Sequence, residues 1–188
     1  SGTAQGAPIC IYGMAFAASQ SNTGEELYCN VAVNLILERC HFGASVNATG
    51  ILVSLVGANS KVIARDCVFS INSGTNHAMI WANDAKAELY SCAFATTGSS
   101  FAGTLIRTNG EADVVVGCSF DVSSVSTVGS RFGIEQANTG SLCVLGCRFV
   151  VNAQAFAACI HLLGSLTTVD ACDFGTSVWY DVSGLLTV

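Results

Sequence analysis

The sequence contains ten cysteines, and each thiol could be a nucleophile, a metal ligand or half of a disulfide. Their spacing narrows the choice. No Cys-x-x-Cys pair occurs, so the sequence predicts no zinc site, and we expect neither metal nor cofactor. A catalytic thiol needs a neighbouring histidine. Only Cys40 has one, His41, and adjacent strand residues point to opposite faces.

Seven cysteines share a Cys-x-aromatic motif that recurs along the chain with a near-constant spacing. The motif cysteines are Cys10, Cys40, Cys67, Cys92, Cys118, Cys147 and Cys172. Their aromatic partners are Tyr12, Phe42, Phe69, Phe94, Phe120, Phe149 and Phe174. A near-constant period indicates a repeat architecture, in which equivalent positions of successive units lie side by side.

The repeated cysteines and phenylalanines are therefore predicted to form a core ladder. A buried, reduced cysteine packs as a small hydrophobic residue, and the phenylalanines are expected to stack. Disulfides are the alternative, because strands about 4.8 Å apart are close enough for a bridge. Side chains on parallel strands in register point the same way, which disfavours the bridge geometry.

A second column is predicted to face outward in successive repeats and contains Trp81, Arg107, Glu135 and His161. These four are candidates for carbohydrate binding, and Glu135 with His161 could supply acid–base chemistry. The alternative is a structural strip, in which Arg107 pairs with Glu135 and packs against Trp81.

Acidic residues are otherwise too scattered to favour an enzyme. Glycosidases need two carboxyl groups about 5–10 Å apart, and no acid clearly faces Asp113, Asp170 or Asp173 in the predicted stack. Several charges are expected to pair on the outer face instead: Glu38 with Arg65, Arg39 with Asp66, and Arg148 with Asp173.

The elements that position these columns are short strands separated by Asn-, Gly- and Ser-rich turns. Apolar residues alternate within each strand, which directs one face inward. One repeat cannot bury that face alone, so the repeats must stack. The predicted fold is an all-β, single-stranded parallel β-helix of about seven coils, each of roughly 25–30 residues, forming a single domain over residues 1–188.

Composition excludes some functions. Net charge is −6 without a basic run, which argues against nucleic-acid binding. Mean hydropathy is +0.54, but no apolar stretch is long enough for a membrane span. With only 11% charged residues, some of the surface is expected to be covered by a partner.

From Cys10 to Phe174 the pattern resembles the right-handed parallel β-helix superfamily, which includes pectate-lyase-like enzymes, phage tailspikes and β-solenoid adhesins. The resemblance implies the fold and leaves the function open. We expect a structural or adhesive subunit of an extracellular filament or a virion tail fibre, which self-associates and contacts surface glycans. The alternative is a polysaccharide-cleaving enzyme of the tailspike type.

The two ends bear on assembly, because a β-helix exposes unpaired strand edges there. No capping helix is predicted, and the C-terminal segment from Leu185 to Val188 is apolar. Either the chain is a fragment of a longer fibre, or neighbouring subunits stack on its ends as homo-oligomers or trimers.

Overall fold

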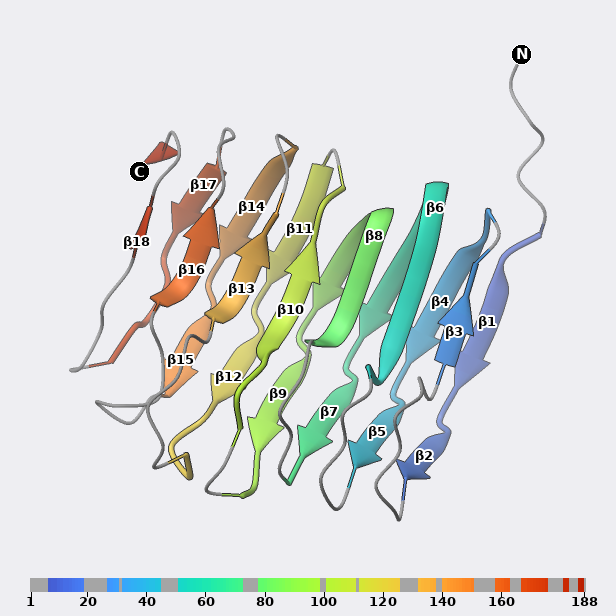
Figure 1. Cartoon of the computed structure of the whole chain (residues 1–188), viewed down its shortest axis with the longest axis horizontal. Helices are drawn as coiled ribbons and strands as arrows, with labels where there is room; N and C mark the ends of the chain where they lie inside the picture. The colour runs from blue at the N-terminus through green and yellow to red at the C-terminus, as the bar shows by residue number, and fades with distance from the viewer. Residues whose placement is uncertain are drawn as a thin grey trace.

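The computed structural model describes residues 7–18, 27–30, 32–44, 51–72, 78–98, 101–110, 112–125, 132–137, 140–150, 158–162, 167–175, 181–182 and 186–187. Every regular element in these ranges is a β-strand, and all their strand pairs are parallel. Successive coils lie side by side along the long axis of the molecule (Figure 1). The predicted fold class, an all-β parallel β-solenoid, is confirmed.

The strands form three faces, which the chain visits in turn. Face 1 contains β3 (Leu27–Cys29), the first parts of β6 (Val53–Arg65) and β8 (Ala78–Tyr90), β10 (Thr104–Thr108), β13 (Phe132–Gln136), β16 (Ala158–Leu162) and β18 (Asp181–Val182). Face 2 contains β1 (Ile9–Tyr12), β4 (Asn34–Glu38), the second parts of β6 and β8, β11 (Ala112–Val116), β14 (Ser141–Leu145), β17 (Thr167–Asp170) and β19 (Leu186–Thr187).

Face 3 is a separate six-stranded sheet. It contains β2 (Ala15–Ala18), β5 (His41–Ala44), β7 (Val68–Ile71), β9 (Ala93–Thr96), β12 (Ser119–Asp121) and β15 (Arg148–Val150). Faces 1 and 2 together count as one 13-stranded sheet, because β6 and β8 run through the corner between them.

The corner between faces 2 and 3 depends on one left-handed residue in each coil. These residues have φ between 52° and 64° and are Gly13, Arg39, Asp66, Ser91, Gly117, Gly146 and Ala171. The left-handed conformation turns the chain sharply, and glycine reaches it without the steric cost that other residues carry. Each of them immediately precedes the position of the motif cysteine, so the turn directs that side chain into the core.

The corner between faces 1 and 2 is less regular. Asn59 and Asp84 have φ of 70° and 53° there, and the register between β6 and β8 shifts between Val56 and Ser60. The Nδ2 of Asn109 donates to the Oδ1 of Asn83 at 2.7 Å, and the Oδ1 of Asn109 accepts from the backbone N–H of Asp84. Side-chain amides thus link adjacent coils where the backbone ladder is interrupted.

A continuous stack of phenyl rings fills the core beneath face 3. Neighbouring ring centroids are 4.6–5.2 Å apart, and the ring planes differ by 2–12°. The stack contains Phe16, Phe42, Phe69, Phe94, Phe120, Phe149 and Phe174. All but the two terminal rings are at most 1% exposed.

The predicted first motif is wrong. Cys10 pairs with Ile36, whereas Phe16 pairs with Phe42. The first repeat unit is therefore Met14-Ala15-Phe16, and Cys10 lies outside the ladder with an exposed side chain. The step from Met14 to Cys40 matches the spacing of the later repeats, whereas the step from Cys10 is longer than any of them. A chance Cys-x-aromatic match just before Met14 concealed this phase.

Candidate functional site

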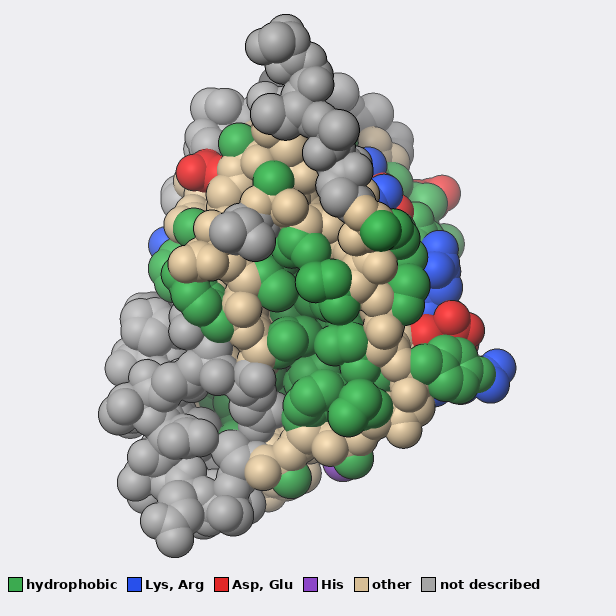
Figure 2. All heavy atoms as spheres, turned by 90° about the vertical axis from the view of Figure 1, so that its right-hand side faces the viewer, with side chains coloured by type: hydrophobic (Ala, Val, Ile, Leu, Met, Phe, Trp, Pro, Cys, Tyr) green, Lys and Arg blue, Asp and Glu red, His purple; other side chains and the backbone are tan. Residues whose placement is uncertain are grey.

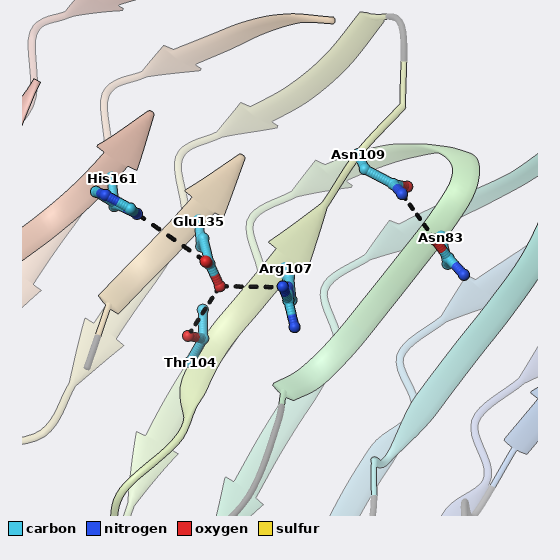
Figure 3. A network of polar contacts seen from close by, with 6 residues as sticks. All are labelled: Asn83, Thr104, Arg107, Asn109, Glu135 and His161. Atoms are coloured by element: carbon cyan, nitrogen blue, oxygen red, sulfur yellow. Dashed lines mark hydrogen bonds and ion pairs between the residues drawn. The ribbon is translucent and has the colours of Figure 1, made fainter. Parts of the chain in front are cut away.

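The outer strip consists of Trp81, Arg107, Glu135 and His161, one residue from each of β8, β10, β13 and β16. The parallel register aligns Trp81 with Arg107, Arg107 with Glu135, and Glu135 with His161. The structure therefore brings all four predicted residues together on face 1, as Figure 3 shows for three of them.

Glu135 is the centre of the strip's polar contacts (Figure 3). Its Oε2 lies 3.3 Å from Nε of Arg107 and accepts a hydrogen bond from Thr104 Oγ1 at 3.4 Å. Its Oε1 lies 4.0 Å from Nδ1 of His161. The Glu135 side chain is only 13% exposed, so this carboxylate is held by protein groups. A carboxylate in such contacts orients the side chains around it.

Arg107 connects the acid to the aromatic ring. Its guanidinium carbon lies 5.9 Å from the centroid of the Trp81 ring, within the range of a cation–π contact. With 38% of its side chain exposed, Arg107 is the member of the Arg107–Glu135 pair that reaches solvent. The strip can present a cation, an indole and a histidine to a polar ligand.

The register extends the strip beyond the four predicted residues. Tyr28 pairs with Ser54, and Ser54 with Trp81, at one end. At the other end the backbone pairing places Asp181 beside His161. Two rungs separate Asp181 from Glu135, about 9.6 Å at the usual strand spacing. Sequence reasoning missed Asp181, because the step from His161 to Asp181 is shorter than the repeat period.

The thiol ladder occupies the inner corner between faces 2 and 3 and contains Cys40, Cys67, Cys92, Cys118, Cys147 and Cys172. The first five are 1–2% exposed, and Cys172 is partly buried. Each S–H donates to the carbonyl oxygen two residues earlier, with S···O distances of 3.3–3.5 Å. Cysteine thus serves as a small hydrophobe that also satisfies a carbonyl next to the left-handed turn.

Neighbouring thiols of the ladder also contact one another. Backbone N–H groups of Cys40 and Cys147 donate to the sulfurs of Cys67 and Cys172, each at 3.4 Å. Hydrogen bonds with adjacent thiols, and then burial, raise the pKa of Cys67 and Cys118. Hydrogen bonds with Cys118 and Cys67 lower the pKa of Cys92, which lies between them. All ten cysteines are free thiols in the structure.

The cysteines outside the ladder have different surroundings. Cys159 is buried at the face 1 strand β16, where burial raises its pKa to about 12. Cys143 is half-buried and Cys10 is exposed. Among the residues that the structure describes, no three His, Cys, Asp or Glu side chains converge on a point where they could hold a metal ion.

The expected charge pairs form only in part. Arg148 and Asp173 make an exposed ion pair at 3.6 Å. Glu38 does align with Arg65, but Arg65 lies over the Tyr90 ring instead. Arg39 likewise stacks on Tyr12 and donates to its hydroxyl at 2.6 Å. An aromatic face binds a guanidinium without removing it from water, which makes it an effective competitor for a surface carboxylate.

Asp113, one of the scattered acids, is 1% exposed and lies within the core. Its Oδ1 accepts a hydrogen bond from the Ala87 N–H at 2.8 Å, and its Oδ2 has no hydrogen-bond partner in the described part of the chain. Burial raises the pKa of this carboxyl. A polar hollow of about 440 Å³ lies nearby on the outside of the corner, with Asp84, Lys86 and Asn109 in its lining.

The end of the solenoid at the first coil is an apolar surface. Four large apolar residues of this first coil are 49–58% exposed: Ile9, Tyr12, Met14 and Tyr28. Figure 2 shows this end, with hydrophobic side chains filling its centre and backbone or other side chains around them. In the described structure β1, β2 and β3 each pair with a strand on one side only. This end surface therefore combines exposed apolar side chains with three unpaired strand edges.

Comparison of the chain with protein-family models, with curated proteins and with solved structures finds no match. Among the described residues, none forms a helix that is long and apolar enough to cross a membrane.

Proposed function

We propose that this protein is a structural β-solenoid subunit that works by stacking coil on coil with a second copy. The observation that carries the proposal is the end surface of the first coil, where half-exposed apolar residues coincide with unpaired strands. An unpaired parallel strand presents free backbone donors and acceptors to any chain that can continue the ladder. Burying Ile9 and Met14 adds a hydrophobic contribution of roughly 25 cal/mol per Å² of apolar surface.

The second copy is the favoured occupant because the columns of this chain repeat. Phe16 begins the phenyl stack and Phe174 ends it, and both rings are only partly buried. Another copy stacked head to tail would place one ring against the other at the spacing already used inside the chain. Such a contact is heterologous and generates filaments.

Head-to-tail stacking suits a subunit of an extracellular filament, a virion tail fibre or a spike. In such an assembly the outer faces remain available for contact with surfaces, including glycans. The outer strip, with its indole, guanidinium and imidazole, is the favoured position for a glycan contact.

Sedimentation velocity over a concentration series tests the stacking. The wild-type chain is expected to form larger species as concentration rises, and Ile9→Lys should shift that transition to higher concentration by about tenfold or more. Val68→Lys is the matched control, because Val68 is 41% exposed but lies on face 3, away from the end surface.

A wild-type chain that stays monomeric at high concentration would remove the self-association proposal. Equal effects of Ile9→Lys and Val68→Lys would show that general surface hydrophobicity, rather than the end surface, drives association. Far-ultraviolet circular dichroism of both variants checks that the fold is retained.

A second candidate function is polysaccharide hydrolysis on face 1. The observation that favours it is the backbone register, which pairs Glu135 with His161 and His161 with Asp181. Inverting glycosidases use two carboxyl groups roughly 6.5–9.5 Å apart, close to two rungs of a β-sheet. The contacts of Glu135 with Arg107 and Thr104 oppose this function, because a catalytic carboxylate must reach the substrate.

Assays against a polysaccharide panel separate the two functions. If face 1 is catalytic, Glu135→Gln and Asp181→Asn should each abolish turnover without lowering the unfolding temperature substantially. Asp173→Asn is the control, because Asp173 is exposed in an ion pair on another part of the surface. Absence of turnover across the panel would leave the structural function as the better supported one.

A further inference from the structure

A column of sulfur atoms extends beyond the thiol ladder by one residue. Tyr12 pairs with Glu38, Ala15 pairs with His41, and the His41 N–H donates to the Met14 carbonyl at 2.8 Å. This register places Met14 beside Cys40, at the position that a cysteine takes in the later coils. The sulfur column therefore begins with a thioether and continues with thiols.

The first two residues of the sulfur column, Met14 and Cys40, differ in solvent exposure. Met14 is 52% exposed on the end surface, whereas Cys40 is 2% exposed just beneath it. Met14 therefore borders solvent, and Cys40 is the ladder thiol next to it in the backbone register. The deeper pairs, such as Cys67 with Cys92, are buried on both sides.

The geometry of the column selects the kind of ion. No three ligating side chains of the His, Cys, Asp and Glu types converge within the described residues, which disfavours a tetrahedral ion such as zinc. Sulfurs in a single line offer ligands in pairs. Thioether and thiolate ligands together prefer soft ions, and Cu(I) and Ag(I) accept two-coordinate sulfur sites.

The net charge of the bound ion and its ligands indicates which pair of sulfurs in the column can bind it. A monovalent cation bound by one thiolate and one neutral thioether has no net charge, so its burial avoids the cost of an uncompensated ion. The Met14–Cys40 pair satisfies this condition, whereas a pair of two thiolates would bury a negative charge. The Cys40 Sγ lies 3.5 Å from the carbonyl oxygens of both Glu38 and Ile11, and the Glu38 oxygen keeps the Gly13 N–H as a donor at 3.0 Å when the thiol proton is lost.

We propose that Met14 and Cys40 form a binding site for one soft monovalent ion, Cu(I) or Ag(I), at the entrance to the sulfur column. Binding forms one bond from the ion to Met14 Sδ and one to Cys40 Sγ. The Cys40 thiol proton passes to water, and no electron is transferred. Stacking of a second copy would cover Met14, so the site belongs to the monomer and is tested on it.

Titration with Ag(I) tests the site, because silver shares the sulfur preference of Cu(I) and needs no reductant. At a protein concentration where the chain is monomeric, the first equivalent should bind with release of one proton and raise the unfolding temperature. Met14→Leu keeps the size and apolar character of the side chain, and it should weaken the first equivalent by about tenfold or more.

Cys10→Ser is the matched control, because Cys10 is an exposed thiol of the same coil outside the column. It should leave the first equivalent unchanged. Cys40→Ser should remove the proton release, and if that variant fails to fold, Met14→Leu alone still decides. Equal affinity in wild type and Met14→Leu, or loss of binding in Cys10→Ser, would overturn the proposal and indicate adventitious binding to a surface thiol.

Discussion

Two columns of side chains run along the solenoid with the same strand spacing but opposite composition. The inner stack repeats one residue, phenylalanine, with ring centroids 4.6–5.2 Å apart. The outer strip changes residue in each coil, from an indole to a guanidinium, a carboxylate and an imidazole. A parallel sheet in register sets equivalent residues side by side, which suits apolar rings and disfavours equal charges.

The charged residues of face 2 illustrate the same rule. Lys61 and Lys86 are in register, so their ammonium groups are neighbours. Glu88 lies between them, with Oε1 3.5 Å from the first and 2.8 Å from the second nitrogen. Burial would raise the pKa of Glu88, but the two lysines outweigh burial and lower it. Repetition is thus stable inside the solenoid, while outside it requires compensating charges.

Removing a ring from the middle of the inner stack should have the largest effect. Phe94→Ala deletes a side chain that is 1% exposed and contacts rings on both sides, so it should lower the free energy of unfolding by about 3–5 kcal/mol. Phe16→Ala, at the half-buried end of the stack, should cost less. Urea unfolding measures both free energies. An equal loss of unfolding free energy in the two variants would show that the cost does not depend on how deeply the ring is buried.

Asp113 breaks the apolar rule of the interior, so its replacement should stabilise the protein. Burial raises the native pKa of Asp113 above its unfolded value. The stabilising contribution of its protonated form is therefore present below the ordinary aspartate pKa and is lost as pH rises through the native value. At neutral pH Asp113→Asn should stabilise the protein by about 1–3 kcal/mol, because a neutral amide replaces a carboxyl group whose charged form is disfavoured by burial.

The gain from Asp113→Asn should shrink as the pH falls towards the ordinary aspartate range, because the wild-type carboxyl is then protonated. Thermal unfolding across a pH series measures this dependence. Asp173→Asn, at a side chain that is 66% exposed, serves as the control and should show no comparable gain. A gain that is independent of pH would show that ionisation of Asp113 is not the cause.

The left-handed corner allows a reciprocal test within one column. Ser91 and Gly117 occupy equivalent positions in successive coils, with φ of 52° and 62°. Gly117→Ala should destabilise the fold by about 1 kcal/mol, and Ser91→Gly should stabilise it by a smaller amount, because only glycine adopts this conformation without strain. Denaturant midpoints measure both. Changes of the same sign would contradict this account of the corner.

The smallest effect is expected in the outer strip. A double-mutant cycle with Arg107→Gln and Glu135→Gln should give a coupling energy of about 0.2–1 kcal/mol, because Arg107 is 38% exposed. The coupling should decrease at high salt, as expected for a partly exposed pair. A coupling energy larger than the losses expected for the inner phenylalanines would show that the outer strip, not the inner stack, contributes more to stability.

The sequence by itself determined the parallel β-solenoid, the columns of ladder cysteines and phenylalanines from Cys40 onward, and the alignment of Trp81, Arg107, Glu135 and His161. These features follow from spacing alone, because stacking in register converts a sequence period into a spatial column.

Only the tertiary structure decided the phase of the first coil, the inward direction of Asp113, the pairing of Arg39 with Tyr12, and the backbone pairing of Asp181 with His161. Strand alternation assigns a side chain to a face only after the strand is positioned relative to its corner, and connections of variable length hide that position. Surface partners depend on further competition between aromatic rings and carboxylates that are distant in sequence. Local spacing contains no information about that competition, which folding settles in three dimensions.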